Sequence, residues 1–165
     1  MSLNDALLPE FDREMGATRR VLTLVPDAHL AFKPHEKSMT LGQLATHLAE
    51  LPVWAPRILQ QSLFEIGPGG IERHAAESSR AILDLFDRHV TSARAALAAR
   101  TDAEYLARWT YRKDGHDVFT LPKAAVIRTM VMNHMVHHRG QLTVYLRLLG
   151  IPLPPLYGPT ADEVA

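Results

Sequence analysis

The residues of this sequence best suited to chemistry are two histidines four positions apart, His134 and His138. They lie in residues 120–150, where apolar residues recur at helical spacing and predict one long helix. At about 100° per residue, both imidazoles fall near the centre of its apolar arc, one turn apart. Two inward imidazoles at this spacing are how one helix offers two ligands to a single metal ion. The arc itself consists of Ile127, Met130, Val131, Leu142, Tyr145, Leu148 and Leu149.

A third ligand has to come from another segment. The helix predicted over residues 40–60 carries a third inward-facing histidine, His47. Thr40-Leu41-Gly42-Gln43 has the form of a capping box, which predicts that a helix begins at this point. His47 follows on this helix, so its imidazole is expected to point into the core. It shares one helical face with Leu44, Leu51, Trp54, Ala55 and Ile58.

These three histidines have two interpretations. A single inward histidine is more often an ordinary core residue, bonded to backbone or water, than a metal ligand. Three buried imidazoles, however, leave six ring nitrogens to satisfy where helices offer few free backbone groups. One cation would satisfy three nitrogens at once. The residues alone therefore leave a core cluster and a metal site equally open.

Two further histidines compete for a place at such a site. His89 lies on the inward arc of a predicted helix, and His137 directly precedes His138. We favour a structural role for both, because adjacency or a single inward ring is weak evidence for metal ligation. His137 is expected at the rim of the pocket.

Other polar residues also fall on or near the core faces. Glu14 lies on the apolar arc of the first predicted helix, where an unpaired carboxylate is costly. It is a candidate fourth ligand, hydrogen-bond acceptor or general base, unless it lies in water at a bundle end. Gln141 and Gln43 lie one turn from histidines and would orient their rings, or else act as solvated or capping residues.

The composition excludes several classes of protein. Eighteen basic and eighteen acidic residues cancel, without a block of like charge, which disfavours nucleic acid or an anionic membrane as partner. No apolar run is long enough for a membrane span, and acidic residues near the N-terminus argue against a secretory signal. We therefore expect a cytoplasmic protein. The absence of cysteine rules out disulfides and protein thiolates, so a thiol would have to come from a substrate.

The rest of the chain predicts four amphipathic helices with long connections. Pro52 is expected to kink the second helix one turn beyond His47. Gly67-Pro68-Gly69-Gly70 is the strongest turn signal, and residues 63–75 are expected to form a loop. Residues 101–119 are either a short hairpin or an aromatic loop over one bundle end. The predicted helices span about residues 3–24, 40–60, 77–100 and 120–150. The fold class is thus an all-α, antiparallel four-helix bundle, as one domain over residues 1–165.

Three stretches of the sequence together form a recognisable pattern: residues 44–48, residues 134–142 with 145–147, and residues 155–163, of which the second is the most specific. On these residues the sequence resembles the DinB family, and the likeness covers essentially the whole chain. It implies a bundle of up-down-down-up connectivity, usually a homodimer. It also implies a divalent metal held by one histidine of the second helix and two of the fourth. These positions correspond here to His47, His134 and His138.

Three neutral histidines leave a coordination position open, which is typical of a catalytic metal. They suit Zn, Ni, Fe or Mn, and the ion would activate either water or a substrate thiol. The resemblance implies relatives that are thiol-dependent transferases and isomerases, so we expect a metal-dependent transferase that uses a low-molecular-weight thiol, with a hydrolase as the nearest enzymatic alternative.

Two other classes of function are weighed against an enzyme. One is a non-catalytic stress-response homodimer that binds metal or a ligand. The other treats residues 41–48 as the start of a DNA-binding helix-turn-helix. It has little support, because the supposed recognition helix, residues 53–58, carries one cation and a proline where several Lys or Arg would be needed.

Overall fold

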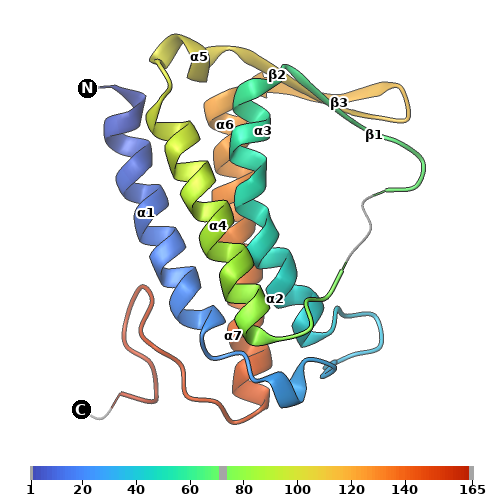
Figure 1. The fold of residues 1–165 in the computed structure, drawn as a ribbon, viewed down its shortest axis with the longest axis vertical. Coiled ribbons are helices and arrows are strands. Elements are labelled where there is room, and N and C mark those ends of the chain that lie inside the picture. Colours follow the sequence, from blue (N-terminus) through green and yellow to red (C-terminus); the bar gives the residue numbers. More distant parts are fainter. Residues whose placement is uncertain (1, 71–73, 164–165) are drawn as a thin grey trace.

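The computed structural model describes residues 2–70 and 74–163. Its longer helices run side by side, and a small sheet lies across one end of them (Figure 1). The chain runs away from the sheet along α1, towards it through α2 and α3, towards it again along α4, and away through α6 and α7. The helices are α1 (Leu3–Leu22), α2 (Leu41–Glu50), α3 (Trp54–Gln60), α4 (Ser79–Ala98), α5 (Asp102–Leu106), α6 (Lys123–Ile127) and α7 (His134–Leu148). The strands are β1 (Leu63–Ile66), β2 (Arg108–Lys113) and β3 (His116–Pro122).

The prediction of an all-α four-helix bundle is wrong, because the three strands form a mixed sheet. Strand β1 pairs in parallel with β2, and β2 pairs antiparallel with β3. The first strand lies within residues 63–75, which were expected to be only a loop. Its four residues are too few to show a period, and its partner strand is far away in the sequence.

The hairpin alternative for residues 101–119 is correct. Lys113 pairs with His116 across a two-residue loop, in which Asp114 has a φ of 49° and Gly115 a φ of 78°. Two left-handed residues in succession form the turn whose twist matches that of a hairpin, and Asp-Gly is a preferred sequence for it. The short helix α5 precedes the hairpin.

The predicted start and kink of the second helix are confirmed. The side chains of Thr40 and Gln43 each accept a hydrogen bond from the other residue's backbone amide, which completes the capping box of α2. The α-helix ends at Glu50, and residues 51–53 form a 3-10 turn before α3 begins. Pro52 lies in this turn, where its missing amide hydrogen breaks the α-helical hydrogen-bond ladder.

The fourth predicted helix differs from expectation in its start and in its middle. Thr120 belongs to β3, so the helix begins only at Lys123, and residues 128–133 form a π-helix. A π turn holds more residues than an α turn, so a count at about 100° per residue falls out of step beyond it. Leu148, predicted to face the core, is 61% exposed. The buried face of α7 is instead formed by Met135, Arg139, Leu142 and Leu146.

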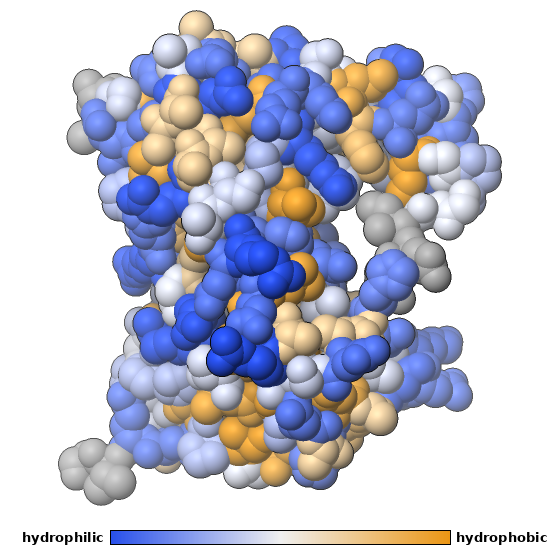
Figure 2. All heavy atoms as spheres, in the orientation of Figure 1, coloured by the Kyte–Doolittle hydropathy of each residue, from blue (hydrophilic) through white to orange (hydrophobic). Residues whose placement is uncertain are grey.

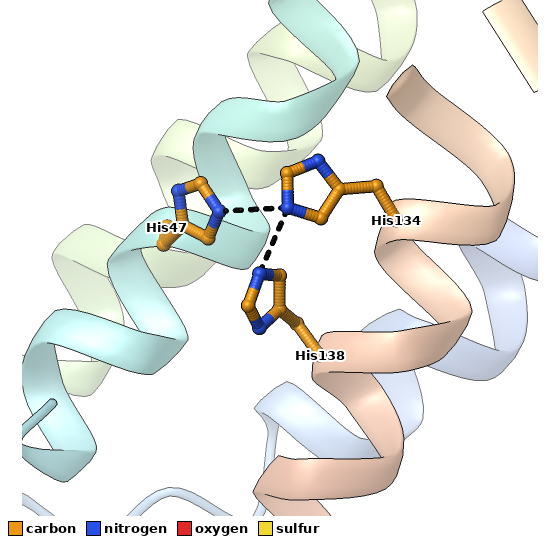
Figure 3. A group of neighbouring side chains, drawn as sticks. All are labelled: His47, His134 and His138. Atoms are coloured by element: carbon orange, nitrogen blue, oxygen red, sulfur yellow. Dashed lines mark hydrogen bonds between the residues drawn. The ribbon is translucent and has the colours of Figure 1, made fainter. Parts of the chain in front are cut away.

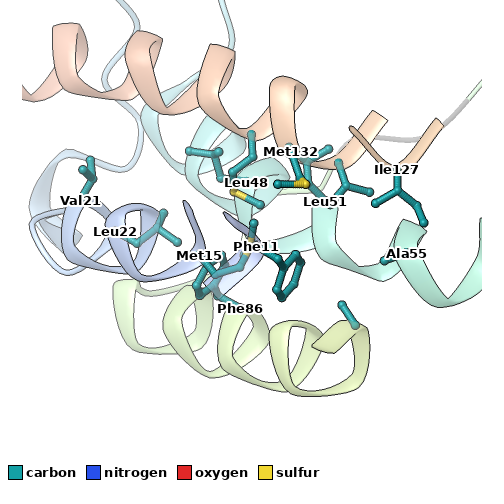
Figure 4. Packing of buried hydrophobic residues seen from close by; sticks show 14 of the residues in the cluster. Phe11, Met15, Val21, Leu22, Leu48, Leu51, Ala55, Phe86, Ile127 and Met132 are labelled. Carbon is teal, nitrogen blue, oxygen red and sulfur yellow. The ribbon is translucent and has the colours of Figure 1, made fainter. Parts of the chain in front are cut away.

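One continuous core joins the helices (Figure 4). Phe11 and Met15 of α1, Leu48 of α2 and Phe86 of α4 are all buried in it. Each such side chain contributes roughly 1.5–3 kcal/mol when it leaves water completely. Because α1 and α2 each pack against both α4 and α7, this core fixes the distance between α2 and α7.

The outer faces of the helices are polar. Arg94 of α4 forms a two-hydrogen-bond ion pair with Asp12 of α1, and both side chains are about half exposed. Arg19 and Asp87 link the same two helices in the same way. Within residues 2–70 and 74–163, none of the helices combines the length and the apolarity that crossing a membrane requires.

Gly150 ends α7 in a conformation that side chains disfavour, and we expect Gly150→Ala to destabilise the fold by about 1 kcal/mol. Its φ is 74°, and the amide of Ile151 donates back to the carbonyl of Leu146. Urea unfolding followed by circular dichroism measures this. Gly16→Ala is the control, since Gly16 is an exposed helical residue of α1 with open space around it, and the change should stabilise by about 0.5–1 kcal/mol. Equal changes in the free energy of unfolding in the two variants would mean that the backbone conformation of Gly150 does not require glycine.

Candidate metal centre

Three histidine side chains converge between α2 and α7 (Figure 3). The Nε2 atom of His134 lies 3.4 Å from Nε2 of His47 and 2.8 Å from Nε2 of His138. The potential ligand atoms of the three residues all lie within 4.8 Å of one another. The structure therefore brings together the same three histidines that the sequence pattern singled out.

The helices explain this convergence. His134 is the first residue of α7 and His138 lies one turn later, so their rings lie side by side with centroids 4.6 Å apart. The helix α2 packs against α7 and presents His47 to this pair. All three side chains are partly exposed, because they lie at the edge of the core face. A small molecule can therefore reach the cluster.

The spacing of the nitrogens suits a shared ion. Three nitrogens that each lie about 2.1 Å from one tetrahedral ion are about 3.4 Å apart. The His47 and His134 nitrogens match this value, and those of His134 and His138 are somewhat closer. The group contains only imidazoles, and this donor set suits Zn, Ni or Fe. The residues thus fit a divalent transition metal.

Gln141 determines which nitrogen of His138 faces the other two rings. The Nδ1 atom of His138 lies 2.6 Å from Oε1 of Gln141, and a carbonyl oxygen can only accept a hydrogen bond. The proton of the neutral ring is therefore on Nδ1, which leaves the Nε2 lone pair directed at the cluster. This confirms the expected orienting role of Gln141. Gln43 acts in the capping box instead.

Comparison with known proteins identifies the family. The sequence model of the DinB family matches residues 1–165. The chain belongs to the DinB family. The resemblance seen in its residues is thereby confirmed.

Similar proteins span nearly the whole of this DinB chain. It is 24% identical over 163 residues to the uncharacterised protein YrdA of Bacillus subtilis (strain 168). The aligned residues cover 98% of this chain and 92% of the relative. A solved DinB-like protein from Bacillus cereus has a TM-score of 0.69 at 26% identity and covers 91% of this chain and 95% of its own. The DinB-like protein YjoA from Bacillus subtilis has a TM-score of 0.70 at 20% identity and covers 92% and 96%.

The two rival histidines lie outside the three-residue group of this DinB protein. The Nδ1 atom of His89 is 2.9 Å from the backbone carbonyl oxygen of Ala49 and donates to it, which gives this ring the structural role expected for it. His137 is exposed, and its ring centroid lies 4.9 Å from that of His138. It therefore adjoins the cluster from the solvent side.

Glu14 lies in a separate buried network and not with the histidines. The Nη2 atom of Arg139 donates to its carboxylate at 2.6 Å, and Nη1 donates to its backbone carbonyl at 3.0 Å. The hydroxyl of Tyr157, from the C-terminal segment, donates to the same carboxylate at 2.6 Å. Burial raises the pKa of Glu14, whereas the hydrogen bonds from Tyr157 and Arg139 lower it by a larger amount in total. The pKa of Glu14 therefore lies below its usual value of 4.5.

The sequence interpretation missed Arg139 in this network. It lies directly after His138 and is only 1% exposed. A uniform helical count leaves Arg139 off the predicted core arc, because the π-helix at residues 128–133 shifts the register of α7, so no pattern in the sequence would have found it.

We expect Glu14→Gln to lower the free energy of unfolding at pH 7 by about 3–5 kcal/mol, because it leaves the buried Arg139 without a counterion. The pKa of Glu14 is lowered by folding, so its contribution is present above about pH 4.5 and is lost as the pH falls through the folded-state pKa. The difference between wild type and variant should therefore shrink in acid. Urea titrations between pH 3 and pH 7 measure it.

Asp12→Asn provides the matched control for this buried pair. The Asp12–Arg94 pair also joins an arginine to a carboxylate of α1, through two hydrogen bonds, but it is exposed to water, so its loss should cost less than about 1 kcal/mol. A comparable loss at both sites would mean that burial of the Glu14 pair has no special effect.

Proposed function

We propose that this DinB family member is a metal-dependent transferase, in which His47, His134 and His138 hold a divalent ion that activates a small thiol for attack on an electrophile. The observation that supports this is the convergence of three Nε2 atoms at a partly exposed position between two packed helices. A purely structural metal site is normally closed by a fourth protein ligand, whereas this group offers three.

When bound, such an ion acts as a Lewis acid and lowers the pKa of a thiol or water at its open position. The residues of the chain hold the geometry for this step. The core fixes α2 against α7, and Gln141 keeps the His138 proton on Nδ1. Because the chain contains no cysteine, the thiol has to be supplied by a small-molecule substrate. We extend the proposal to a homodimer acting in the cytoplasm, as expected from the sequence.

The first test measures metal content and turnover together. We expect His47→Ala, His134→Ala and His138→Ala each to lose at least about 90% of bound Zn, Ni, Fe or Mn, because two imidazoles hold an ion far more weakly than three. Conjugation of free cysteine to 1-chloro-2,4-dinitrobenzene should fall in parallel. Elemental analysis of the purified protein and absorbance assays provide these values.

His137→Ala is the matched control, since this histidine adjoins the cluster but lies outside the group of three. It should retain the metal. Full conjugation activity in metal-free protein would refute the transferase. Bound metal without turnover of thiol would favour the non-catalytic binding protein, and hydrolysis without conjugation would favour the hydrolase.

A second test concerns the residue that orients His138. We expect Gln141→Ala to weaken metal binding by about 10–100-fold, which is the usual effect of removing a hydrogen-bond partner of a ligand. Gln141→Glu keeps an acceptor oxygen and should retain most of the affinity. Competition with a chromophoric zinc chelator measures both constants, and equal affinities for wild type and Gln141→Ala would show that the hydrogen bond does not matter.

A further inference from the structure

A row of aromatic side chains crosses the sheet on one face. Phe64 of β1, Tyr111 of β2 and Phe119 of β3 are direct cross-strand neighbours. The ring centroids of Phe64 and Tyr111 are 6.3 Å apart with planes inclined by 11°, and those of Tyr111 and Phe119 are 5.6 Å apart with planes inclined by 30°. Trp109 lies two residues before Tyr111 on β2 and therefore on the same face. Because Trp109 is buried, this is the face that meets the helices.

The row continues beyond the part of the sheet that the helices cover. Trp109 is 1% exposed, whereas Phe64, Tyr111 and Phe119 remain partly exposed. In Figure 1 the tip of the sheet overhangs the side of α2 and α3. Figure 2 shows a hollow beneath this overhang. The aromatic row thus packs against the edge of the core and keeps part of its surface exposed on the underside of the overhang.

Trp54 connects this underside to the histidine cluster. Its ring meets that of Phe64 edge to face, with centroids 4.6 Å apart. It follows His47 by seven residues, across the end of α2 and the 3-10 turn at residues 51–53, which is roughly 10–12 Å along the chain. Glu50 and Val53 between them are also partly exposed. Partly exposed residues therefore lead along α2 and α3 from the histidines to the aromatic side chains.

A cation lies at the aromatic end of these partly exposed residues. The guanidinium carbon of Arg57 lies 5.4 Å from the centroid of the Trp54 ring, in a cation–π contact. Arg57 is exposed, and it forms no ion pair with a carboxylate among the described residues. Guanidinium groups bind carboxylates with two parallel hydrogen bonds. The charge at this end is therefore suited to an anionic group.

We propose that Trp54, Phe64, Tyr111 and Phe119 form the subsite for the electrophilic substrate, and that this substrate is a flat aromatic ring system carrying an acidic group. The rings contact the aromatic part, Arg57 pairs with the acidic group, and the reactive carbon reaches towards the three histidines. This inference rests on the proposed function for its link to the metal. It adds the class of substrate, which the histidines by themselves leave open.

Binding of 2-naphthoate, an aromatic acid of suitable shape, tests the subsite without turnover. We expect the zinc-loaded wild-type protein to bind it and to show quenching of Trp54 fluorescence. Loss of an edge-to-face or stacking partner, worth about 0.5–1.5 kcal/mol, should raise its Kd by about 2- to 13-fold in Phe64→Leu and Trp54→Leu. Arg57→Gln should raise the Kd by a similar factor and should leave the binding of uncharged naphthalene unchanged. For Trp54→Leu the Kd comes from naphthoate fluorescence.

Phe32→Leu is the matched control, since Phe32 is also a partly buried aromatic residue but pairs with Tyr145 away from the sheet. It should bind 2-naphthoate as the wild type does. Zinc content and thermal unfolding are measured for every variant, so that loss of metal or of folding is recognised. Equal Kd values for 2-naphthoate in the wild type and in Phe64→Leu, Trp54→Leu and Arg57→Gln would overturn the proposed subsite. Failure of the folded wild type to bind 2-naphthoate would also overturn it.

The link to the metal is measured with Mn²⁺ in place of zinc, through paramagnetic relaxation of the naphthoate protons. Relaxation that gives a distance of about 10 Å, and that is lost in Trp54→Leu, supports the proposal. Tight, aromatic-dependent binding without any relaxation would overturn it as a substrate subsite. Failure of the proposed function is distinct from this, because it shows as metal that is absent or dispensable for conjugation in the histidine variants.

Discussion

The arrangement of α7 depends on the buried ion pair between Arg139 and Glu14. The guanidinium of Arg139 is held by the carboxylate and the backbone of Glu14, and Tyr157 shares the same carboxylate. A charge that is 1% exposed is tolerated only with such partners, so this side of α7 has to face α1. The neighbouring side then falls at the edge of the core. His134 and His138 lie on that neighbouring side, where they are held firmly and still meet solvent.

The position of His47, which faces α7 across the histidine cluster, depends on where α2 begins and ends. A capping box at Thr40 fixes where α2 begins, and the 3-10 turn around Pro52 fixes where it ends. Between these two points the apolar side of α2 packs on α4 and α7, and His47 lies next to that packed face. Rigid helices on both sides allow three imidazoles to approach without loops that must order first. The 3-10 turn joins α2 to α3, whose first residue is Trp54, so the histidine cluster and the aromatic row are connected through adjacent helices.

The sheet contributes aromatic side chains that the helices alone would not place near the histidine cluster. A helical bundle alone would leave the histidines on an open flank, whereas the overhanging strands add an aromatic surface next to α3, the helix that follows the one bearing His47. The parallel pairing of β1 with β2 ties the connection between α3 and α4 to the hairpin. This connection is long because α3 and α4 both run towards the sheet, so the chain has to return along the length of the body.

The sequence by itself determined the family, the helical segments around the histidines, the capping box, the hairpin turn as one of two alternatives, and the identity of the three converging histidines. These features are local or periodic, and periodicity is carried by the residues themselves. The tertiary structure alone decided the rest. The π-helix at residues 128–133 shifts the register of α7, so that Arg139 is buried and Leu148 is exposed. Strand β1 exists because β2 lies beside it, and Glu14 pairs with Arg139 because α1 packs on α7. Such contacts join residues distant in sequence, so no local pattern reports them.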